Sequence, residues 1–556
     1  MKTGRIIIVI VTGCLFLAGM GIVKYNQIAA SEAVHHITLE DSLVQIENED
    51  EIFGELIEKT QEYNPGICFE GTLLPYDKKD NRLYLPQNYN ESEWYGELTA
   101  VIEGEKHPLY ILQDEMLGKK EEAIRESHDF TLYVQLNDRE YSRFLLAITG
   151  MPLISMTTEY EVEAEEIPYE VDPDKKHFGS ETRYYGEFLM MDSGSRSGQY
   201  EIAETALCYH YKGASTAGFE KKSYSIDLLD YRGEKVNISL AGMRSDSTWK
   251  LNSLCTDENR IREITASQIW ELIDDANAQI NESGPVMEYV ELIVDNDYKG
   301  IYCLVEPIDA KKMDLQKSDI LYKVIDWQIP EAEDIQESVN RGWKIQYPVR
   351  IRYPKEIKDY QRAWYPMGDY LNIFYRDGEM PYEEAVKHID LDNYCDMMIF
   401  VMAVTASDNC FKNTYYVAEC GEAIQNYQMK QIPWDLDYTF GNEYCLESEK
   451  NVIFDGYCGK IIAEEALLYL YEKNPEEMAA LLNKKWKEYR ESFLSTESIL
   501  ALLEGNREYL LDTGAFIRER ERWPQIGVDM NIEYLKEFQD ERMRWLDEYF
   551  EALFDY

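Results

Sequence analysis

Basic residues are scarce in this chain of 556 residues. Lys and Arg number 56 against 105 Asp and Glu, which gives a formal net charge of −49. A surface of this charge repels the phosphate backbone of nucleic acids, so we expect no nucleic-acid binding. The acidic balance is typical of a solvated surface that keeps a protein soluble, and it would also attract basic partners or divalent cations.

Closely spaced cysteine pairs are absent. The ten cysteines include no Cys-x-x-Cys pair, so the sequence does not support a structural zinc site. Apart from Cys14, nine cysteines remain, an odd number that cannot all pair within one chain. We expect most of them to be small buried apolar residues.

Long uncharged runs are also rare, and the clearest one lies at the N-terminus. Residues 6–23 carry no charge and no proline, follow a basic start and end at Lys24. The run is just long enough to span a bilayer, and its positive flank is expected to stay in the cytoplasm. Residues 1–30 therefore predict a signal anchor or a cleaved signal peptide. A lipoprotein box at Cys14 fits less well, because the apolar run continues beyond it. We expect a membrane-anchored protein with an extracellular domain, or a secreted one.

The remaining chain divides by composition. Hydrophobic residues make up 45%, which is ample for a packed core and excludes a disordered protein. Residues 31–60 are polar and acidic with a weak helical pattern, and they predict a stalk. Residues 61–165 hold short apolar runs at hairpin-like spacing, which predict a small β domain. A charged linker is expected at 166–182. The strands expected in the β domain lie at 83–85, 98–102, 109–112, 130–134 and 144–148.

The character changes again from residue 183. Three strands are expected first, at 186–191, 205–211 and 223–228, then a helix at 258–275 and a hairpin at 287–306. This order of strands, helix and hairpin is that of a kinase-like N-terminal lobe. The loop 212–222 holds small and hydroxyl residues, and backbone N–H groups in such a turn can cradle an anion.

Polar side chains that suit phosphoryl transfer follow an apolar helix expected at 390–406. Asp408 and Asn413 have the Asp-x4-Asn interval of a kinase catalytic loop, although the usual His-Arg before the Asp is missing. Asp435 and Asp437 share one side of an extended segment and would repel each other without a cation between them. Together these residues predict an acceptor-activating Asp and a metal site next to nucleotide phosphates. From about residue 460 the chain is almost all amphipathic helix, which predicts a scaffold.

A set of short motifs, taken in order over 183–445, resembles the CotH kinase-like family. The motifs are Lys212-Gly213-Ala214-Ser215, Lys221-Lys222-Ser223-Tyr224-Ser225-Ile226, Leu240-Ala241-Gly242-Met243, Trp249-Lys250-Leu251-Asn252, Asp257 with Arg262, Val290-Glu291-Leu292-Ile293, Gly300 to Glu306, Asp408 with Asn413, Ile432 to Asp437, and Phe440-Gly441.

The resemblance implies an α+β, two-lobed atypical protein-kinase-like domain over 183–445, preceded by the β domain and completed by helices over 446–556. It implies transfer of the ATP γ-phosphate to Ser of a surface or coat protein, basic and Ser-rich, with Mg²⁺ or Mn²⁺. Lys222 and Asp408 would be catalytic, with Lys222 also holding phosphate. The implied metal ligands are Asn413, Asp435 and Asp437. The implied nucleotide-binding residues are Lys212, Ser215, Arg262 and Glu306.

One departure and two alternatives stand beside this interpretation. The family has Arg-Gly where this chain has Lys212-Gly213, which keeps the charge and loses bidentate geometry. A non-catalytic cell-surface module with a structural metal site, Ca²⁺ included, is the main alternative. A glycosidase with two carboxylates is the lesser one.

Overall fold

The computed structural model of the chain describes residues 24–27, 42–163, 182–194, 198, 200–213, 218–277, 283–376, 379–421, 423–445, 450–453, 459 and 461–553. Of residues 24–27, 443–445 and 450–453 only the backbone is described. The apolar run 6–23, the linker 166–182 except its last residue, and Ser215 lie outside these residues. The chain is 32% helix and 30% strand, which is compatible with the predicted α+β class.

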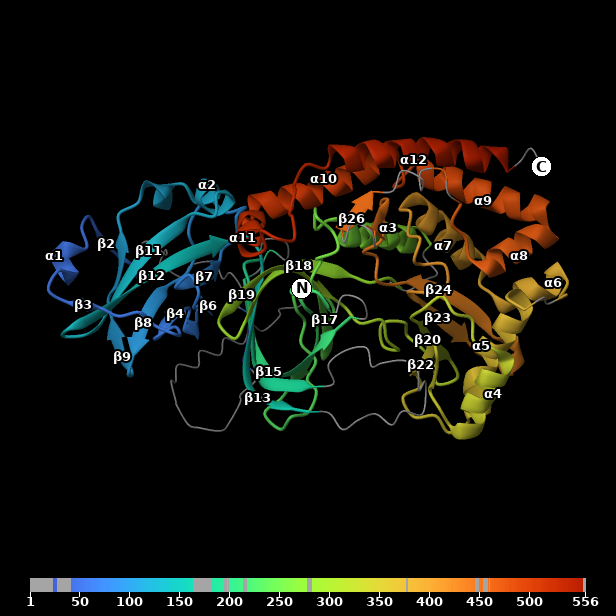
Figure 1. Cartoon of the computed structure of the whole chain (residues 1–556), viewed down its shortest axis with the longest axis horizontal. Helices are drawn as coiled ribbons and strands as arrows, with labels where there is room; N and C mark the ends of the chain where they lie inside the picture. Colours follow the sequence, from blue (N-terminus) through green and yellow to red (C-terminus); the bar gives the residue numbers. More distant parts are fainter. Residues whose placement is uncertain are drawn as a thin grey trace, which may run out of the picture.

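The first part of the chain forms two sheets at the left of Figure 1. Its elements are β2 (Val44–Ile46), α1 (Asp50–Phe53), β3 (Ile57–Glu58), β4 (Ile67–Phe69), β5 (Thr72–Leu73), β6 (Tyr76–Asp77), β7 (Arg82–Pro86), β8 (Leu98–Ile102), β9 (Glu105–His107), β10 (Leu109–Leu112), η2 (Glu115–Gly118), α2 (Lys120–Arg125), β11 (Asp129–Asn137) and β12 (Glu140–Thr149). One sheet has the order β2-β10-β11-β12-β7-β6 with β3 beside β12, and the other the order β5-β4-β8-β9. All five strands expected here are present.

The described half of the predicted stalk joins the first sheet. β2 pairs with β10 and β3 pairs with β12. Phe53 is buried and lies 4.7 Å from Tyr141 between ring centroids. The helical pattern expected here is wrong outside α1, because its apolar residues pack on a sheet instead of along a helix.

A closed barrel occupies the middle of the molecule. Its strands are β13 (Leu153–Val162), β14 (Arg183–Asp192), β15 (Glu201–Lys212), β16 (Ser223–Leu229), β17 (Thr248–Asn252), β18 (Met287–Val294) and β19 (Asp297–Val305). The sheet runs β15-β14-β13-β18-β19-β17-β16, and β16 pairs back with β15, which closes the ring; β1 (Lys24–Gln27) adds to β15.

On β16, β18 and β19 nearly all residues of both strand faces are buried. Alternate residues such as Trp249, Leu251 and Tyr302 fill the interior. Residues between them, such as Cys303, face outward and pack with α3 (Arg262–Ala276), the helix between β17 and β18. The outer face of β17 is therefore turned toward the rest of the chain.

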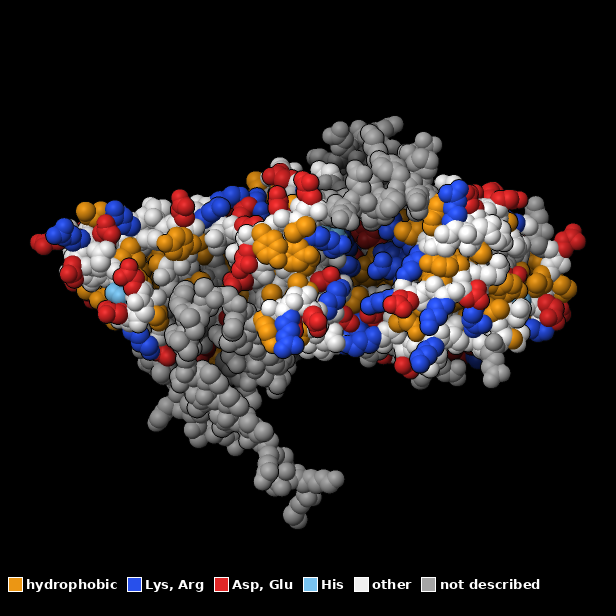
Figure 2. Space-filling view, turned by 90° about the horizontal axis from the view of Figure 1, so that it is seen from below, with side chains coloured by type: hydrophobic (Ala, Val, Ile, Leu, Met, Phe, Trp, Pro, Cys, Tyr) orange, Lys and Arg blue, Asp and Glu red, His pale blue; other side chains and the backbone are white. Residues whose placement is uncertain are grey.

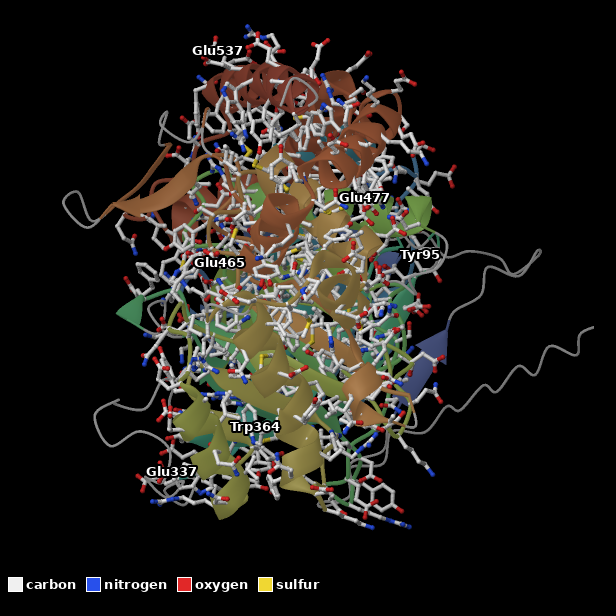
Figure 3. All side chains as sticks on the ribbon, turned by 90° about the vertical axis from the view of Figure 1, so that its right-hand side faces the viewer. Tyr95, Glu337, Trp364, Glu465, Glu477 and Glu537 are labelled. Atoms are coloured by element: carbon white, nitrogen blue, oxygen red, sulfur yellow. The ribbon has the colours of Figure 1, made fainter. Side chains whose placement is uncertain are left out.

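A five-stranded sheet with helices forms the right-hand part of Figure 1. Its elements are β20 (Ile320–Val324), α4 (Ala332–Arg341), β21 (Ile345–Gln346), β22 (Val349–Tyr353), α5 (Tyr360–Phe374), α6 (Tyr382–Ala385), η4 (Val386–His388), α7 (Leu391–Ala403), β23 (Thr414–Glu419), η5 (Ile424–Asn426) and β24 (Gln428–Pro433). The strand order is β21-β22-β20-β23-β24. The helix α7 confirms the predicted apolar helix and contacts β24, where the amide of Asn393 donates to the Gln431 carbonyl at 3.0 Å. Figure 3 shows the side chains of this part, with Trp364 of α5 in its interior.

The remaining chain is mostly helical, as predicted. Its elements are β25 (Asn442–Cys445), β26 (Lys450–Ile453), α8 (Glu465–Lys473), α9 (Pro475–Arg490), α10 (Thr496–Asp512), α11 (Ala515–Arg522) and α12 (Glu533–Ala552). α12 packs on α7, where Gln539 donates to the Ala403 carbonyl at 2.9 Å, while α11 lies against β19. Exposed glutamates such as Glu465, Glu477 and Glu537 line the outer surface of these helices (Figure 3). None of the helices in the described ranges is long and apolar enough to cross a membrane.

Candidate functional site

Asn413 and Asp435 are brought together at the start of the β23–β24 hairpin. Thr414 pairs with Pro433, and the Trp434 amide donates to the Asn413 carbonyl at 2.9 Å. The side chain of Asn409 ties both turns, donating to the carbonyls of Asn413 and Trp434 at 2.9 and 2.8 Å. Hydrogen bonds to the backbone therefore hold Asn413 and Asp435, two of the three predicted metal ligands, next to each other.

The backbone of this pair is unusual. Asn413 has φ +53° and Asp435 has φ +62°. Both values lie in the left-handed region, which residues other than Gly, Asn and Asp rarely adopt. Residues in such conformations cost free energy and cluster at functional sites. The two turns thus aim an amide and a carboxylate in a direction that a regular strand end would not give.

Carboxyl groups crowd around Asp435. Burial, followed by the charges of Asp435, Glu263 and Asp408, raises the pKa of Asp437 well above its usual range, and Thr256 donates to its carboxylate at 3.1 Å. Glu263, near the start of α3, is 3% exposed, and burial followed by the Asp435 charge raises its pKa to about 7. Like charges this close favour a bound proton or cation.

Three lysines lie near one another, Lys212 and Lys250 on the barrel and Lys323 on β20. Lys212 ends β15, donates to Asn252 and lies 5.6 Å from the centre of the Trp434 ring. Lys323 of β20 lies 4.9 Å from that ring. Burial lowers the pKa of Lys323 well below its usual value, which the charge of Asp435 opposes.

Lys250 of β17 completes this cationic group. It shares the outward face of the strand with Asn252, whose amide donates to Glu263, and it donates to Ser225 of β16. Burial, followed by the charges of Lys212 and Arg352, lowers the pKa of Lys250 to about 7. Within the described residues no carboxylate lies within ion-pair distance of Lys212, Lys250 or Lys323. On the face shown in Figure 2, Lys and Arg side chains gather beside a hollow near the middle of the molecule.

Asp408 lies in the turn after α7 and forms an ion pair with Lys412 at 2.5 Å. Sequence reasoning missed Lys412, although its place between Asp408 and Asn413 was a usable signal. A cation on this loop can pair with the Asp408 carboxylate and can also bind a phosphate oxygen.

The contacts of three other predicted residues, Lys222, Arg262 and Glu306, are made with residues outside this group. Lys222 shares a strand face with Tyr224 and Ile226, which point into the barrel, and its carbonyl accepts from Tyr302. Arg262 is 2% exposed and is paired with Asp257, so it fixes the start of α3. The roles predicted for Lys222, Arg262 and Glu306 stay predictions.

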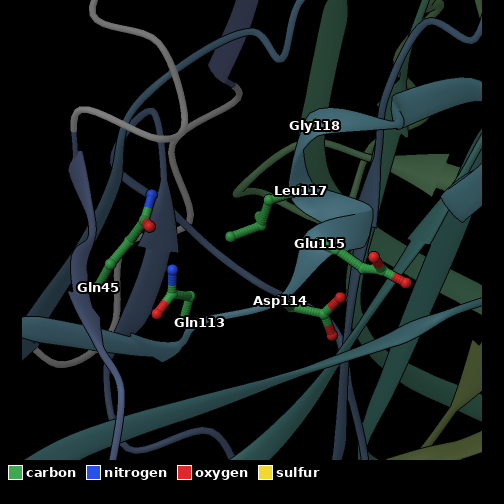
Figure 4. Close-up of a pocket in the computed structure, with 6 residues that line it drawn as sticks. All are labelled: Gln45, Gln113, Asp114, Glu115, Leu117 and Gly118. Carbon is green, nitrogen blue, oxygen red and sulfur yellow. The ribbon is translucent and has the colours of Figure 1, made fainter.

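Glu306 directly follows β19 and is paired with Lys312 at 2.8 Å. It lines a cavity of about 490 Å³ together with Gly242, Arg244, Glu271 and Asp274. A second cavity, of about 480 Å³, lies far away in the N-terminal sheets and is lined by Gln45, Gln113, Asp114, Glu115, Leu117 and Gly118 (Figure 4).

The predicted metal ligands offer oxygen and amide groups from two neighbouring turns. In the part of the chain that the structure describes, no three His, Cys, Asp or Glu side chains form a metal cluster. Asn413 and Asp435 offer hard oxygen donors, and Mg²⁺ is usually held by one or two carboxylates together with substrate phosphates and water. The residues therefore fit a metal that arrives with a nucleotide.

The profile of one protein family, described as CotH kinase protein, matches residues 209–546. The match spans more than half of the chain and includes β16 to α11, all predicted site residues and most of α12. The chain belongs to the CotH kinase protein family. No curated protein matches the chain closely enough to add a relative.

Proposed function

We propose that the protein is an ATP-dependent protein kinase that phosphorylates Ser of a surface or coat protein. One observation supports this most: the charge of Asp435 acts on Glu263 of α3 and on Lys323 of β20, and the charge of Lys250 acts on Lys323 as well. The third strand of β15–β16–β17, the helix that follows it and the Asp435 turn therefore meet. In protein kinases the phosphate-binding Lys lies on the third strand and is joined to a Glu of the next helix. In this proposal the barrel and the α7–β24 region are the two lobes.

The residues of the site have separate tasks in the transfer. Asp408 would accept the proton of the Ser hydroxyl while the Ser oxygen bonds to the γ-phosphorus. The bond between the γ-phosphorus and the oxygen that bridges it to the β-phosphate breaks at the same time, and ADP leaves. Lys212, Lys250 and Lys323 would bind the phosphates, and Lys412 would bind the γ-phosphoryl oxygens. Asn413 and Asp435 would hold Mg²⁺ or Mn²⁺, which supplies charge neutralisation of the phosphates when bound.

The place of action is part of the proposal. The basic N-terminus and the apolar run 6–23 support export. The rest of the chain would then be anchored on the extracellular side of the membrane, or secreted. The protein substrate would then be another exported protein, and the acidic surface of this chain favours a basic, Ser-rich one.

Nucleotide binding is expected to be visible as thermal stabilisation. ATP with Mg²⁺ at about 100 times its Kd should stabilise residues 31–556 by about 2.7 kcal/mol, a shift of a few degrees in Tm. Asp435→Ala should remove the metal dependence of the shift. A shift with Ca²⁺ and none with ATP would contradict the proposal and support a non-catalytic surface module.

ATP affinity is expected to fall as pH rises from 7.5 to 9. With its pKa near 7, Lys250 is mostly neutral in the free protein above that pH, so phosphate binding must take up a proton. One such proton weakens binding by up to about tenfold per pH unit. Calorimetry in two buffers of different ionisation enthalpy would measure the uptake, which Lys250→Met should reduce. Equal affinity at both pH values would contradict this role.

A further inference from the structure

Helix α11 places a fully buried carboxylate against the barrel. Glu519 accepts hydrogen bonds from Lys221 Nζ at 2.6 Å, Arg260 Nε at 3.0 Å and the Ile301 amide at 2.8 Å. The side chains of Glu519, Lys221 and Arg260 are all 0% exposed. In Figure 1, α11 lies beside β19 on the barrel. One residue of the C-terminal helices therefore joins two segments that lie about 300 and 260 residues upstream.

The first segment is the exit of the loop between β15 and β16. Lys221 Nζ also donates to the Ile301 carbonyl at 2.7 Å and lies 4.9 Å from the centre of the Tyr302 ring. The Tyr302 hydroxyl donates to the Lys222 carbonyl at 2.9 Å. The start of β16 is thus fixed at one end of the loop whose other end is Lys212.

The second segment is the turn before α3. Arg260 has φ +62°, and its carbonyl accepts from the Tyr289 hydroxyl at 2.7 Å. α3 begins two residues later, and Glu263 lies in its first turn. A shift of Arg260 would therefore move Glu263, which contacts Asn252 and, through it, Lys212.

The barrel is shaped to admit this carboxylate. Gly300 has φ +85°, and a Cβ at this position would lie 1.9 Å from Glu519 Oε2. Only a residue without a side chain lets the carboxylate reach the Ile301 amide. The hydrogen bond from the Ile301 amide to Glu519 thus depends on the glycine in β19 as well as on the carboxylate of α11.

We infer that Glu519 is a positioning residue of the nucleotide site, holding the entrance of β16 at Lys221 and Lys222 and the start of α3 through Lys221 and Arg260. The inference rests on the proposed function for its kinetic readout. Neither Lys221 nor Arg260 belongs to the group around Asp435, so the effect acts through the position of Lys212, Asn252 and Glu263.

A matched pair of variants separates positioning from general stability. Glu519→Gln is compared with Glu291→Gln, which disturbs a second buried ion pair of the same helix, Arg518 with Glu291 at 2.8 Å. Glu519→Gln is expected to raise KM for ATP about tenfold with kcat changed less, because a small misplacement of binding groups is costly. Glu291→Gln should leave KM for ATP within about twofold while lowering Tm to a similar extent. Equal KM values in the two variants would overturn the inference.

A second variant covers the case in which Glu519→Gln does not fold. Lys221→Met keeps the Arg260 and Ile301 contacts of Glu519 and releases only the loop, so it should also raise KM for ATP. Hydrogen exchange of residues 218–222 and 256–263 gives a readout without activity, and it should speed up in Glu519→Gln and not in Glu291→Gln. Unchanged exchange overturns the inference even if the protein transfers no phosphate, whereas absent ATP binding by the wild-type protein overturns the proposed function alone.

Discussion

Replacing Asp408 with Asn is expected to slow phosphate transfer about 10³-fold while ATP and Mg²⁺ still bind, within the range known for a lost general base. Asn has the size of Asp and cannot accept the hydroxyl proton. Asp408 is not one of the three predicted metal ligands, and the turn that presents it is held by Asn409. The measurement is transfer of labelled phosphate to a basic, Ser-rich protein, with the thermal shift by ATP as a check on binding.

Asp540→Asn is the matched control for this experiment. Asp540 pairs with Arg544 four residues on, as Asp408 pairs with Lys412, but it lies on the surface of α12. Losing an exposed pair of this kind costs about 0.3–0.5 kcal/mol and should leave transfer unchanged. Equal transfer by wild type and Asp408→Asn would show that this carboxylate is not the base.

Local patterns were sufficient to predict many individual elements. The hairpin at 287–306 is observed as β18 and β19, and the helix at 390–406 as α7, begun by an Asp390 side chain that accepts from Asn393. The helix at 258–275 begins later than predicted. Asp257 caps it from a distance, accepting from the amides of Ile261 and Arg262 at 2.7 and 2.8 Å. Short-range hydrogen bonds and apolar periodicity determine these features.

The face of a barrel strand could not be predicted in the same way. Alternation identifies two faces, but on β16, β18 and β19 nearly all residues of both faces are buried. Lys221 and Lys222 are adjacent, and only the closure of β16 onto β15 and β17 decides which one faces out. The Lys250 motif was part of the family resemblance, yet its place on the third strand follows only from strand pairing.

Long-range ion pairs also escaped prediction, because nothing in a local window connects them. Glu519 lies in a helix that looked like scaffold, and its partners are Lys221 and Arg260. The net charge of −49 gave no sign of the cationic group at the site either, since a total charge says nothing of its distribution. In the proposed function, the cationic group would bind the anionic nucleotide while the acidic surface would attract a basic protein substrate.

Lys250→Met and Lys222→Met are expected to differ by about two orders of magnitude in phosphate transfer, the loss typical of removing one electrostatic contact to a reacting group. Lys250 lies on the outward face of β17, and its charge acts on Lys323, on which the charge of Asp435 also acts. Lys222 shares its strand face with Tyr224, which points into the barrel. Lys235→Met is the control, because Lys235 is half exposed and paired with Asp227 on the same sheet.

If Lys222→Met is the more damaging variant, the assignment made from the sequence holds and the one made from strand order is wrong. If Lys250→Met lowers transfer no more than Lys235→Met, the kinase-like arrangement of the barrel loses its main support.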